Sequence, residues 1–483
     1  MSNDDDISMG HLLASYNPWW VAPQGPWRED VPSFKRPILA DLAEDIASLR
    51  QIISVTGPRR VGKTTVLLQL VIHLLDACGV APEHILYFSL DDPALFASPE
   101  LQASILERLV EHRGLERGRR GPVHYFLLDE VQRLPRWELF LKKYYDLNYP
   151  IRFIVSGSAS SPIFRKSRES LLGRIKDRHL LPFSFREFCL FRFHREGDPV
   201  FAEVLSRYRR LRGLLIESRG EEALDLLRQL DTELTRFRSR LDELAMDYWR
   251  EGGLPEVWAI NDVVRKQEYL WDNYVKKVLF EDLAVLKEYR KPENIARLIL
   301  YLLANPGIEL NVSTIARQAG VNRKTVAANL PLLEMTDLVR RIRKFRAQPL
   351  RVREGNFKSY VVDLALRNAV MKSWGAIAGD DTLLGLYAEN AVANHLATWP
   401  EAIEVTYYRE KSGREVDFVV AMGGAARLPV EVKHRRQAEE PRGLTRFMER
   451  YGAPLGIVVT RERRAELRGR VLYVPLRYFL LVS

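Results

Sequence analysis

The chain has 483 residues, of which 46% are hydrophobic and 28% are charged, and its formal net charge at pH 7 is +10. This composition is typical of a multidomain globular protein, and the presence of only two cysteines, Cys78 and Cys189, excludes a disulfide-stabilised scaffold and a cysteine-based metal site. No apolar run approaches the ~18–20 residues of a transmembrane helix and the start MSNDDDISMG is acidic, so we expect a cytoplasmic protein without a membrane partner.

The N-terminal segment, residues 1–36, contains the aromatic and proline-rich stretch NPWWVAPQGPW at 17–27. Such a stretch is apolar enough to pack on a neighbouring domain. We therefore expect it to cover part of the first domain.

The stretch IISVTGPRRVGKTTVLLQLVIHLL begins with a β-branched run, turns at Gly57 and continues as an apolar helical pattern after Lys63. Strand, glycine loop and helix are the context that a P-loop requires, and GPRRVGKT fits its G-x-x-x-x-G-K-[ST] pattern. Backbone N–H groups would bind phosphate, Lys63 would reach the β and γ phosphates, and Thr64 would bind Mg²⁺. The residues predicted to bind ATP are Gly57, Pro58, Arg59, Arg60, Val61, Gly62, Lys63, Thr64 and Thr65.

A second apolar strand, in VHYFLLDEVQRL, ends in the acids Asp129 and Glu130. We expect Asp129 to hold Mg²⁺ with Thr64, and Glu130 to polarise the attacking water. The next apolar run, IRFIVSGSAS, ends in hydroxyl residues, and either Ser156 or Ser158 would sense the γ phosphate; Ser158 is our first candidate. Strands that alternate with helices predict an α/β domain with a parallel sheet and its ligand at the carboxyl ends of the strands.

These motifs resemble the AAA-like P-loop ATPases of bacteria and archaea that carry a C-terminal domain of the DUF4143 type. Further matching pieces are NPWW, LLGR at 171–174, LPFSFREF at 181–188, GGLPE at 252–256 and REVDFVV…EVK near the C-terminus. The resemblance implies an ATPase domain at 37–190, a helical connector at 191–290, a winged-helix-like module at 291–360 and a restriction-endonuclease-like α/β domain at 361–483.

The same resemblance implies a homo-oligomer in which an arginine from one subunit completes the ATP site of its neighbour. Arg174 is the first candidate for this arginine finger, and Arg168 and Arg178 are alternatives. A local ion pair or helix cap is the other interpretation of Arg174.

The connector balances 12 arginines with 12 acids between residues 191 and 250, which indicates a solvated, salt-bridged set of helices. The stretch after it, from Thr314 to Arg353, has ten lysines and arginines against two acids and shows a helix-turn-helix pattern that closes its first helix at Gly320. We expect it to contact DNA, with protein contact as the alternative. The candidate DNA-contacting residues are Asn322, Arg323, Lys324, Thr325, Arg340, Arg341, Arg343 and Lys344.

Acids also occur inside the last strand-like runs, where EVDFVV contains Asp417 and VEVK contains Glu431 and Lys433. The resemblance implies that these residues meet Glu389 of the preceding helix at a metal site, which would take a second Mg²⁺ or Mn²⁺. A buried ion-pair network or a binding cleft is the alternative. His434 is either a phosphate contact or a surface histidine.

Together these features predict an oligomeric Mg²⁺-dependent ATPase that couples ATP hydrolysis to DNA binding, translocation or remodelling. An ATP-gated, metal-dependent DNase and a nucleotide-dependent signalling switch that recognises a protein are the alternatives.

Overall fold

The computed structural model describes residues 3–117, 121–158, 170–282, 292–347, 355–373, 379–423, 426–434, 441–462 and 464–482. The chain divides into two compact units, Met1–Leu181 and Pro182–Ser483. The predicted connector, helix-turn-helix region and C-terminal domain therefore all lie within the second unit. None of the helices in the described ranges is both long and apolar enough to cross a bilayer.

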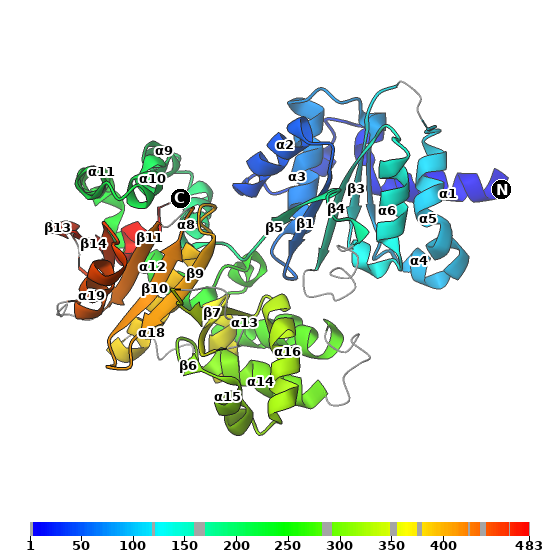
Figure 1. Cartoon of the computed structure of the whole chain (residues 1–483). Helices are drawn as coiled ribbons and strands as arrows, with labels where there is room; N and C mark the ends of the chain where they lie inside the picture. Colours follow the sequence, from blue (N-terminus) through cyan, green and yellow to red (C-terminus); the bar gives the residue numbers. More distant parts are fainter. Residues whose placement is uncertain are drawn as a thin grey trace. The chain divides into compact units, whose positions relative to one another are not determined.

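The first unit is built on a sheet of five parallel strands in the order β2-β3-β4-β1-β5 (Figure 1). Register brings Gly57 beside Ser158 and Ser89 beside Asp129, so the P-loop and the predicted acid lie at the carboxyl edge of one sheet. This is the parallel α/β arrangement that the sequence predicts. The strands are β1 Ile52–Gly57, β2 Ile85–Ser89, β3 His124–Asp129, β4 Ile151–Ser158 and β5 Ile175–His179.

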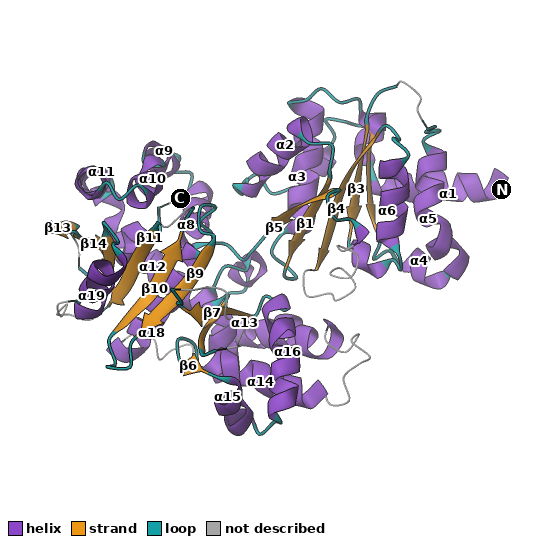
Figure 2. Cartoon of the chain, in the orientation of Figure 1, coloured by secondary structure: helices purple, strands orange, loops and turns teal. Residues whose placement is uncertain are grey.

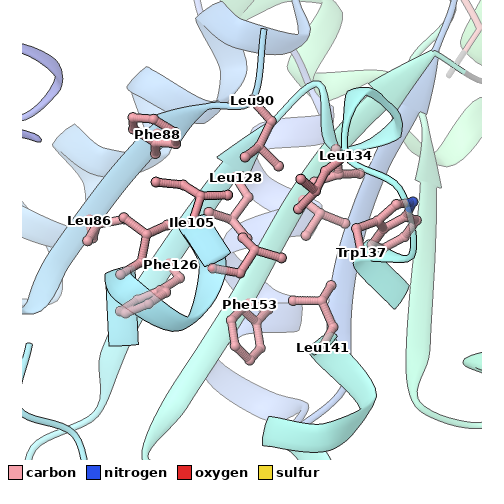
Figure 3. Packing of buried hydrophobic residues seen from close by; sticks show 14 of the residues in the cluster. Leu86, Phe88, Leu90, Ile105, Phe126, Leu128, Leu134, Trp137, Leu141 and Phe153 are labelled. Carbon is pink, nitrogen blue, oxygen red and sulfur yellow. The ribbon is translucent and has the colours of Figure 1, made fainter. Parts of the chain in front are cut away.

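Helices cover both faces of this sheet, with α2 and α3 on one side and α5 and α6 on the other (Figure 1). The second face packs around Phe88, Phe126 and Phe153 of the strands and around Trp137 and Leu141 of α6 (Figure 3). The helices of the unit are α1 Asn3–Tyr16, α2 Ile38–Ser48, α3 Lys63–Asp76, α4 Pro93–Ala97, α5 Pro99–His112 and α6 Trp137–Asp146.

The NPWW stretch packs against the edge strand β2. Asn17 donates from Nδ2 to the carbonyl oxygen of Tyr87 at 2.9 Å and accepts from the Tyr87 N–H at 2.7 Å. The indole N–H groups of Trp19 and Trp20 donate to the carbonyl oxygen of Ile85 at 3.1 and 2.7 Å. The segment thus satisfies backbone groups that an open sheet edge would otherwise expose.

The second unit begins with helices in which ion pairs are frequent, as the balanced charge predicts. Examples are Arg207–Glu233 at 2.5 Å and Arg238–Asp231 at 2.8 Å. These helices are α8 Phe185–Arg195, α9 Val200–Arg207, α10 Arg210–Ile216, α11 Gly220–Glu233, α12 Arg238–Glu251 and α13 Val263–Leu270, followed by α14 Pro292–Ala304.

A single sheet of nine strands, in the order β13-β14-β12-β11-β10-β9-β7-β8-β6, joins the helix-turn-helix region to the C-terminal region (Figure 2). The join is the parallel pair β7–β9, in which Arg343 lies beside Thr406. The strands are β6 Glu309–Leu310, β7 Val339–Lys344, β8 Phe357–Val361, β9 Glu404–Arg409, β10 Glu415–Ala421, β11 Arg427–Lys433, β12 Gly456–Thr460, β13 Glu466–Arg468 and β14 Val471–Pro475.

The helix-turn-helix itself consists of α15 Val312–Ala319 and α16 Arg323–Met335. Gly320 ends α15 in the left-handed region, with a φ of 66°, as its position in the sequence predicts. Strands β7 and β8 then form an antiparallel pair. The remaining helices are α17 Leu364–Met371, α18 Asp381–Leu396, α19 Arg442–Tyr451 and α20 Leu476–Phe479.

Candidate functional site

The P-loop joins β1 to α3 in a conformation that its glycines permit. Gly57 lies so close to the backbone that a Cβ atom there would be 2.1 Å from the carbonyl oxygen of Leu180. Gly62 caps α3 with a φ of 94°, a conformation that glycine adopts without steric strain. The loop therefore presents backbone N–H groups and the N-terminus of α3 toward one point, as an anion site requires.

Lys63 follows the loop and is only 5% exposed. Its Nζ donates to the carbonyl oxygens of Gly57 at 3.2 Å and Pro58 at 2.8 Å. The ammonium group thus lies against the loop that would hold the phosphates.

Asp129 lies at the centre of a hydrogen-bonded cluster and is 2% exposed. Its Oδ2 accepts from the Thr64 hydroxyl at 2.6 Å and the Tyr87 hydroxyl at 3.1 Å. Its Oδ1 accepts from the Ser156 hydroxyl and, at 3.1 Å, from the Glu130 N–H. The two residues predicted to hold Mg²⁺ are therefore in direct contact, and their oxygen atoms suit that ion.

Glu130 follows β3 in a left-handed backbone conformation with a φ of 54°. Its side chain is half-buried and accepts a hydrogen bond from the Gln132 amide. Of the two serines, Ser156 contacts Asp129, while Ser158 is buried beside Gly57 at the end of β4. The structure thus links Ser156 to the acid, whereas our first candidate was Ser158.

Two residues that support this site carry no sequence signal that we recognised. Arg36 is buried and donates from Nη1 to the carbonyl oxygens of Val61 at 3.1 Å and Leu181 at 3.0 Å, which holds the P-loop from outside. Tyr87 of β2 donates to Asp129, and a tyrosine within an otherwise apolar strand was the only indication of this contact.

Two of the three arginine-finger candidates, Arg174 and Arg178, are paired within the first unit. Arg174 bonds Asp146 at 2.7 Å, and Arg178 bonds Asp45 at 2.6 Å. The local ion pair that the sequence left open for Arg174 is thus present. Arg168 lies outside the described residues.

In the second unit, the N-terminal ends of α15 and α16 border a cavity of about 920 Å³. Arg317, Arg323 and Lys324 line it, and all three are exposed. Asn322 is exposed as well, and its side chain caps α16 by accepting from the Lys324 N–H at 2.8 Å. Thr325 and Lys344 are half-buried, and Arg343 is exposed.

Arg340 and Arg341 of β7, which we predicted to contact DNA phosphates, are half-buried. Arg341 has a side chain only 6% exposed, and it bonds Glu334 of α16 at 2.6 Å. Arg340 reaches the carbonyl oxygen of Asn394 at 3.5 Å, and burial lowers its pKa. These two side chains turn toward α16 and α18, whereas Arg343 of the same strand is exposed, and contact of Arg340 and Arg341 with DNA stays a prediction.

The C-terminal residues singled out by the sequence meet in one place. Glu389 of α18, Asp417 of β10 and both Glu431 and Lys433 of β11 line a cavity of about 600 Å³. Lys433 bonds Glu431 at 2.6 Å, and Asp417 accepts from the Val432 N–H at 2.8 Å. Burial, together with the neighbouring Glu389 charge and against the opposing Lys358 charge, raises the pKa of Asp417 to about 7.

Lys358 of β8, which the sequence did not indicate, lies among these acids. Its Nζ is 2.6 Å from Glu415, 3.0 Å from Glu389 and 3.7 Å from Asp417. Burial alone would lower the pKa of Lys358, but the three carboxylates outweigh it and raise that pKa, so the side chain stays charged.

The predicted second Mg²⁺ or Mn²⁺ does not fit these residues. An ammonium group already lies among the carboxylates, and in the part of the chain that the structure describes no three His, Cys, Asp or Glu residues form a cluster able to hold a metal ion. His434 is not at the surface either. It is 9% exposed beside Trp249, and burial lowers its pKa to about 4.

Three family models match successive parts of the chain. One described as an AAA domain matches residues 49–189, and two described as domains of unknown function, DUF8612 and DUF4143, match residues 242–375 and 384–479. The chain is an AAA-like ATPase with a C-terminal DUF4143 domain. The AAA match spans the P-loop and the Asp129 cluster. This region of the AAA-like ATPase therefore binds and hydrolyses ATP.

The AAA-like ATPase is 25% identical over 437 residues to the uncharacterized protein MJ1637 of Methanocaldococcus jannaschii, a match covering 90% of this chain and 85% of that protein. It is 24% identical over 429 residues to the uncharacterized protein Rv2008c of Mycobacterium tuberculosis, covering 88% and 80%. It is also similar to AMPPCP-bound DnaA from Aquifex aeolicus, at 16% identity and a TM-score of 0.24, covering 62% of this chain and 86% of that chain.

Proposed function

We propose that this AAA-like ATPase binds duplex DNA through residues 292–361 and couples ATP hydrolysis to translocation or remodelling of that DNA. The observation that supports DNA contact best is the basic cavity at the start of α15 and α16. Two helix N-termini border it, and Arg317, Arg323 and Lys324 add three exposed cations. Helix N-termini and exposed cations together favour phosphate groups. We propose that the helix-turn-helix and the β7–β8 pair act as a winged helix.

In the first unit, we propose that the Lys63 ammonium group contacts the β and γ phosphates and that Thr64 and Asp129 hold Mg²⁺. Once bound, Mg²⁺ supplies charge neutralisation across the phosphate oxygens. Glu130 would accept a hydrogen bond from the attacking water and orient it, and Ser156 would keep Asp129 in position through its hydroxyl.

We further propose a homo-oligomer in which Arg174 completes the ATP site of a neighbouring subunit. The Arg174–Asp146 pair is solvent-accessible, with side chains 31% and 40% exposed. Exposed ion pairs contribute little to stability, so exchange of Asp146 for a phosphate of the neighbour's ATP is energetically feasible.

We expect the double substitution Arg323→Ala and Lys324→Ala to weaken DNA binding without unfolding the chain, because both side chains are exposed. The slope of log K against log salt is negative, and each phosphate contact contributes about −0.9 to it on duplex DNA. Removing two contacts should therefore reduce the magnitude of this slope by up to about 1.8. Fluorescence anisotropy of a labelled duplex between low and moderate salt measures both quantities.

A matched control removes two arginines from the charge-balanced helices. Arg228 and Arg236 are exposed and form only weak pairs with Asp225 at 3.9 Å and Asp198 at 3.7 Å. Arg228→Ala with Arg236→Ala should leave binding and slope unchanged. Equal losses of DNA affinity in both double variants would mean that DNA binding depends on the net charge of the chain alone. Absence of DNA binding even at low salt would favour a protein partner.

A further inference from the structure

Lys358 is placed in the carboxylate cluster by a strand from outside the DUF4143 match. It belongs to β8, which pairs with β7 and β6 of the helix-turn-helix region. Its side chain is 6% exposed, and its Nζ lies within 4.0 Å of Glu389, Glu415 and Asp417. These acids come from α18 and β10, so one ammonium group connects three elements.

One oxygen atom of each of three acids in the cluster already has a donor, while Glu431 Oε2 is buried without a hydrogen-bond partner among the described residues. Glu389 Oε1 accepts from Lys358 at 3.0 Å and from the Tyr360 hydroxyl at 2.7 Å. Asp417 Oδ2 accepts from the Val432 N–H at 2.8 Å, and Glu431 Oε1 accepts from Lys433 at 2.6 Å. A divalent cation bound to the remaining oxygen atoms would lie beside the ammonium groups of Lys358 and Lys433, and like charges at such distances repel strongly where solvent screening is weak.

We infer that Lys358 is a built-in cation that takes the place of a divalent metal ion in the carboxylate cluster, so that this cluster excludes Mg²⁺ and Mn²⁺ and fastens β8 to α18 and β10. The acids then serve as an ion-pair joint between the helix-turn-helix region and the C-terminal region. Removing one member of this charged cluster of four is destabilising, because it leaves a partly buried charge without its partner. This inference does not depend on DNA binding or on ATP turnover.

Mn²⁺ binding to the full-length, nucleotide-free chain tests this inference. Electron paramagnetic resonance measures the Mn²⁺ that remains free in solution. All variants carry Asp129→Asn, which removes the acid at the proposed Mg²⁺ position of the P-loop. This Asp129→Asn parent chain and the same chain with Asp417→Asn added should bind the same amount of Mn²⁺. Mn²⁺ bound by the parent and lost with Asp417→Asn would overturn the inference, whatever the other variants do.

Lys358→Met removes the ammonium group but keeps most of the side-chain length, and Lys358→Arg keeps the charge. The methionine variant should gain one Mn²⁺ per chain, and that gain should disappear when Asp417→Asn is added. The arginine variant should behave like the parent. A folded methionine variant, judged by circular dichroism, that gains no Mn²⁺ would also contradict the inference, because the cluster would not then resemble a metal site. Should the methionine variant fail to fold, the comparison of the parent with Asp417→Asn still decides.

Discussion

Replacing Glu130 with glutamine is expected to lower the steady-state rate of ATP hydrolysis by about 10²–10⁴-fold while ATP binding is retained, because loss of a general base typically has an effect of that size. Glutamine preserves the shape of the side chain and its contact with Gln132, but it cannot take a proton from water. Release of inorganic phosphate measures the rate, and a fluorescent ATP analogue measures binding.

Two companion variants complete this experiment. Lys63→Ala should weaken nucleotide binding itself, because it removes the cation that lies against the P-loop at Gly57 and Pro58. Glu111→Gln, on the exposed surface of α5, should leave both quantities unchanged. Hydrolysis by the Glu130→Gln chain at the wild-type rate would mean that another group activates the water.

The second large effect is expected at Gly253, where two motifs of the family resemblance meet. A Cβ atom at this position would be 2.3 Å from the carbonyl oxygen and 2.6 Å from the backbone nitrogen of Phe183. The Gly253 N–H donates to Asp363 at 2.7 Å, and the Phe183 N–H donates to the Gly253 carbonyl oxygen at 2.8 Å. The glycine in GGLPE is therefore needed where that loop passes against LPFSFREF.

Gly253→Ala should reduce the free energy of unfolding by about 1–3 kcal/mol, since the backbone must move to admit the methyl group. Urea denaturation followed by circular dichroism measures this change. Gly385→Ala is the control, because Gly385 lies in α18 with open space around its Cβ position. That helix substitution should raise stability by roughly 0.5–1 kcal/mol. Equal midpoints for Gly253→Ala and the wild type would refute the close approach.

The ATP site could be predicted from the sequence because its determinants are local. Gly57, Gly62, Lys63 and Thr64 lie within one strand–loop–helix unit. Asp129 follows an apolar strand, and the parallel sheet brings it to the same edge. The spacing of residues in the P-loop motif therefore predicted both the fold of this region and its chemistry.

Lys358 could not be found in this way, because its role depends on pairing between distant strands. The stretch FKSYV in β8 has no feature that indicates a carboxylate partner, and in the sheet β7 and β9 lie between β8 and β10. Only the folded structure brings the Lys358 side chain to the acids of β10 and α18. The ion pair of Arg341 could not be predicted for a related reason. Local charge predicted exposure, but the acid that pairs with Arg341, Glu334, lies on the helix packed against its strand.

The most direct test of the central claim is the steady-state rate of ATP hydrolysis by the full chain with and without duplex DNA. If hydrolysis is coupled to DNA binding, duplex DNA should stimulate hydrolysis by the wild type and by the Arg228→Ala/Arg236→Ala control. The Arg323→Ala/Lys324→Ala variant should lose this stimulation but keep the basal rate. Equal rates with and without DNA, at a salt concentration where DNA is bound, would contradict the claim that hydrolysis is coupled to DNA.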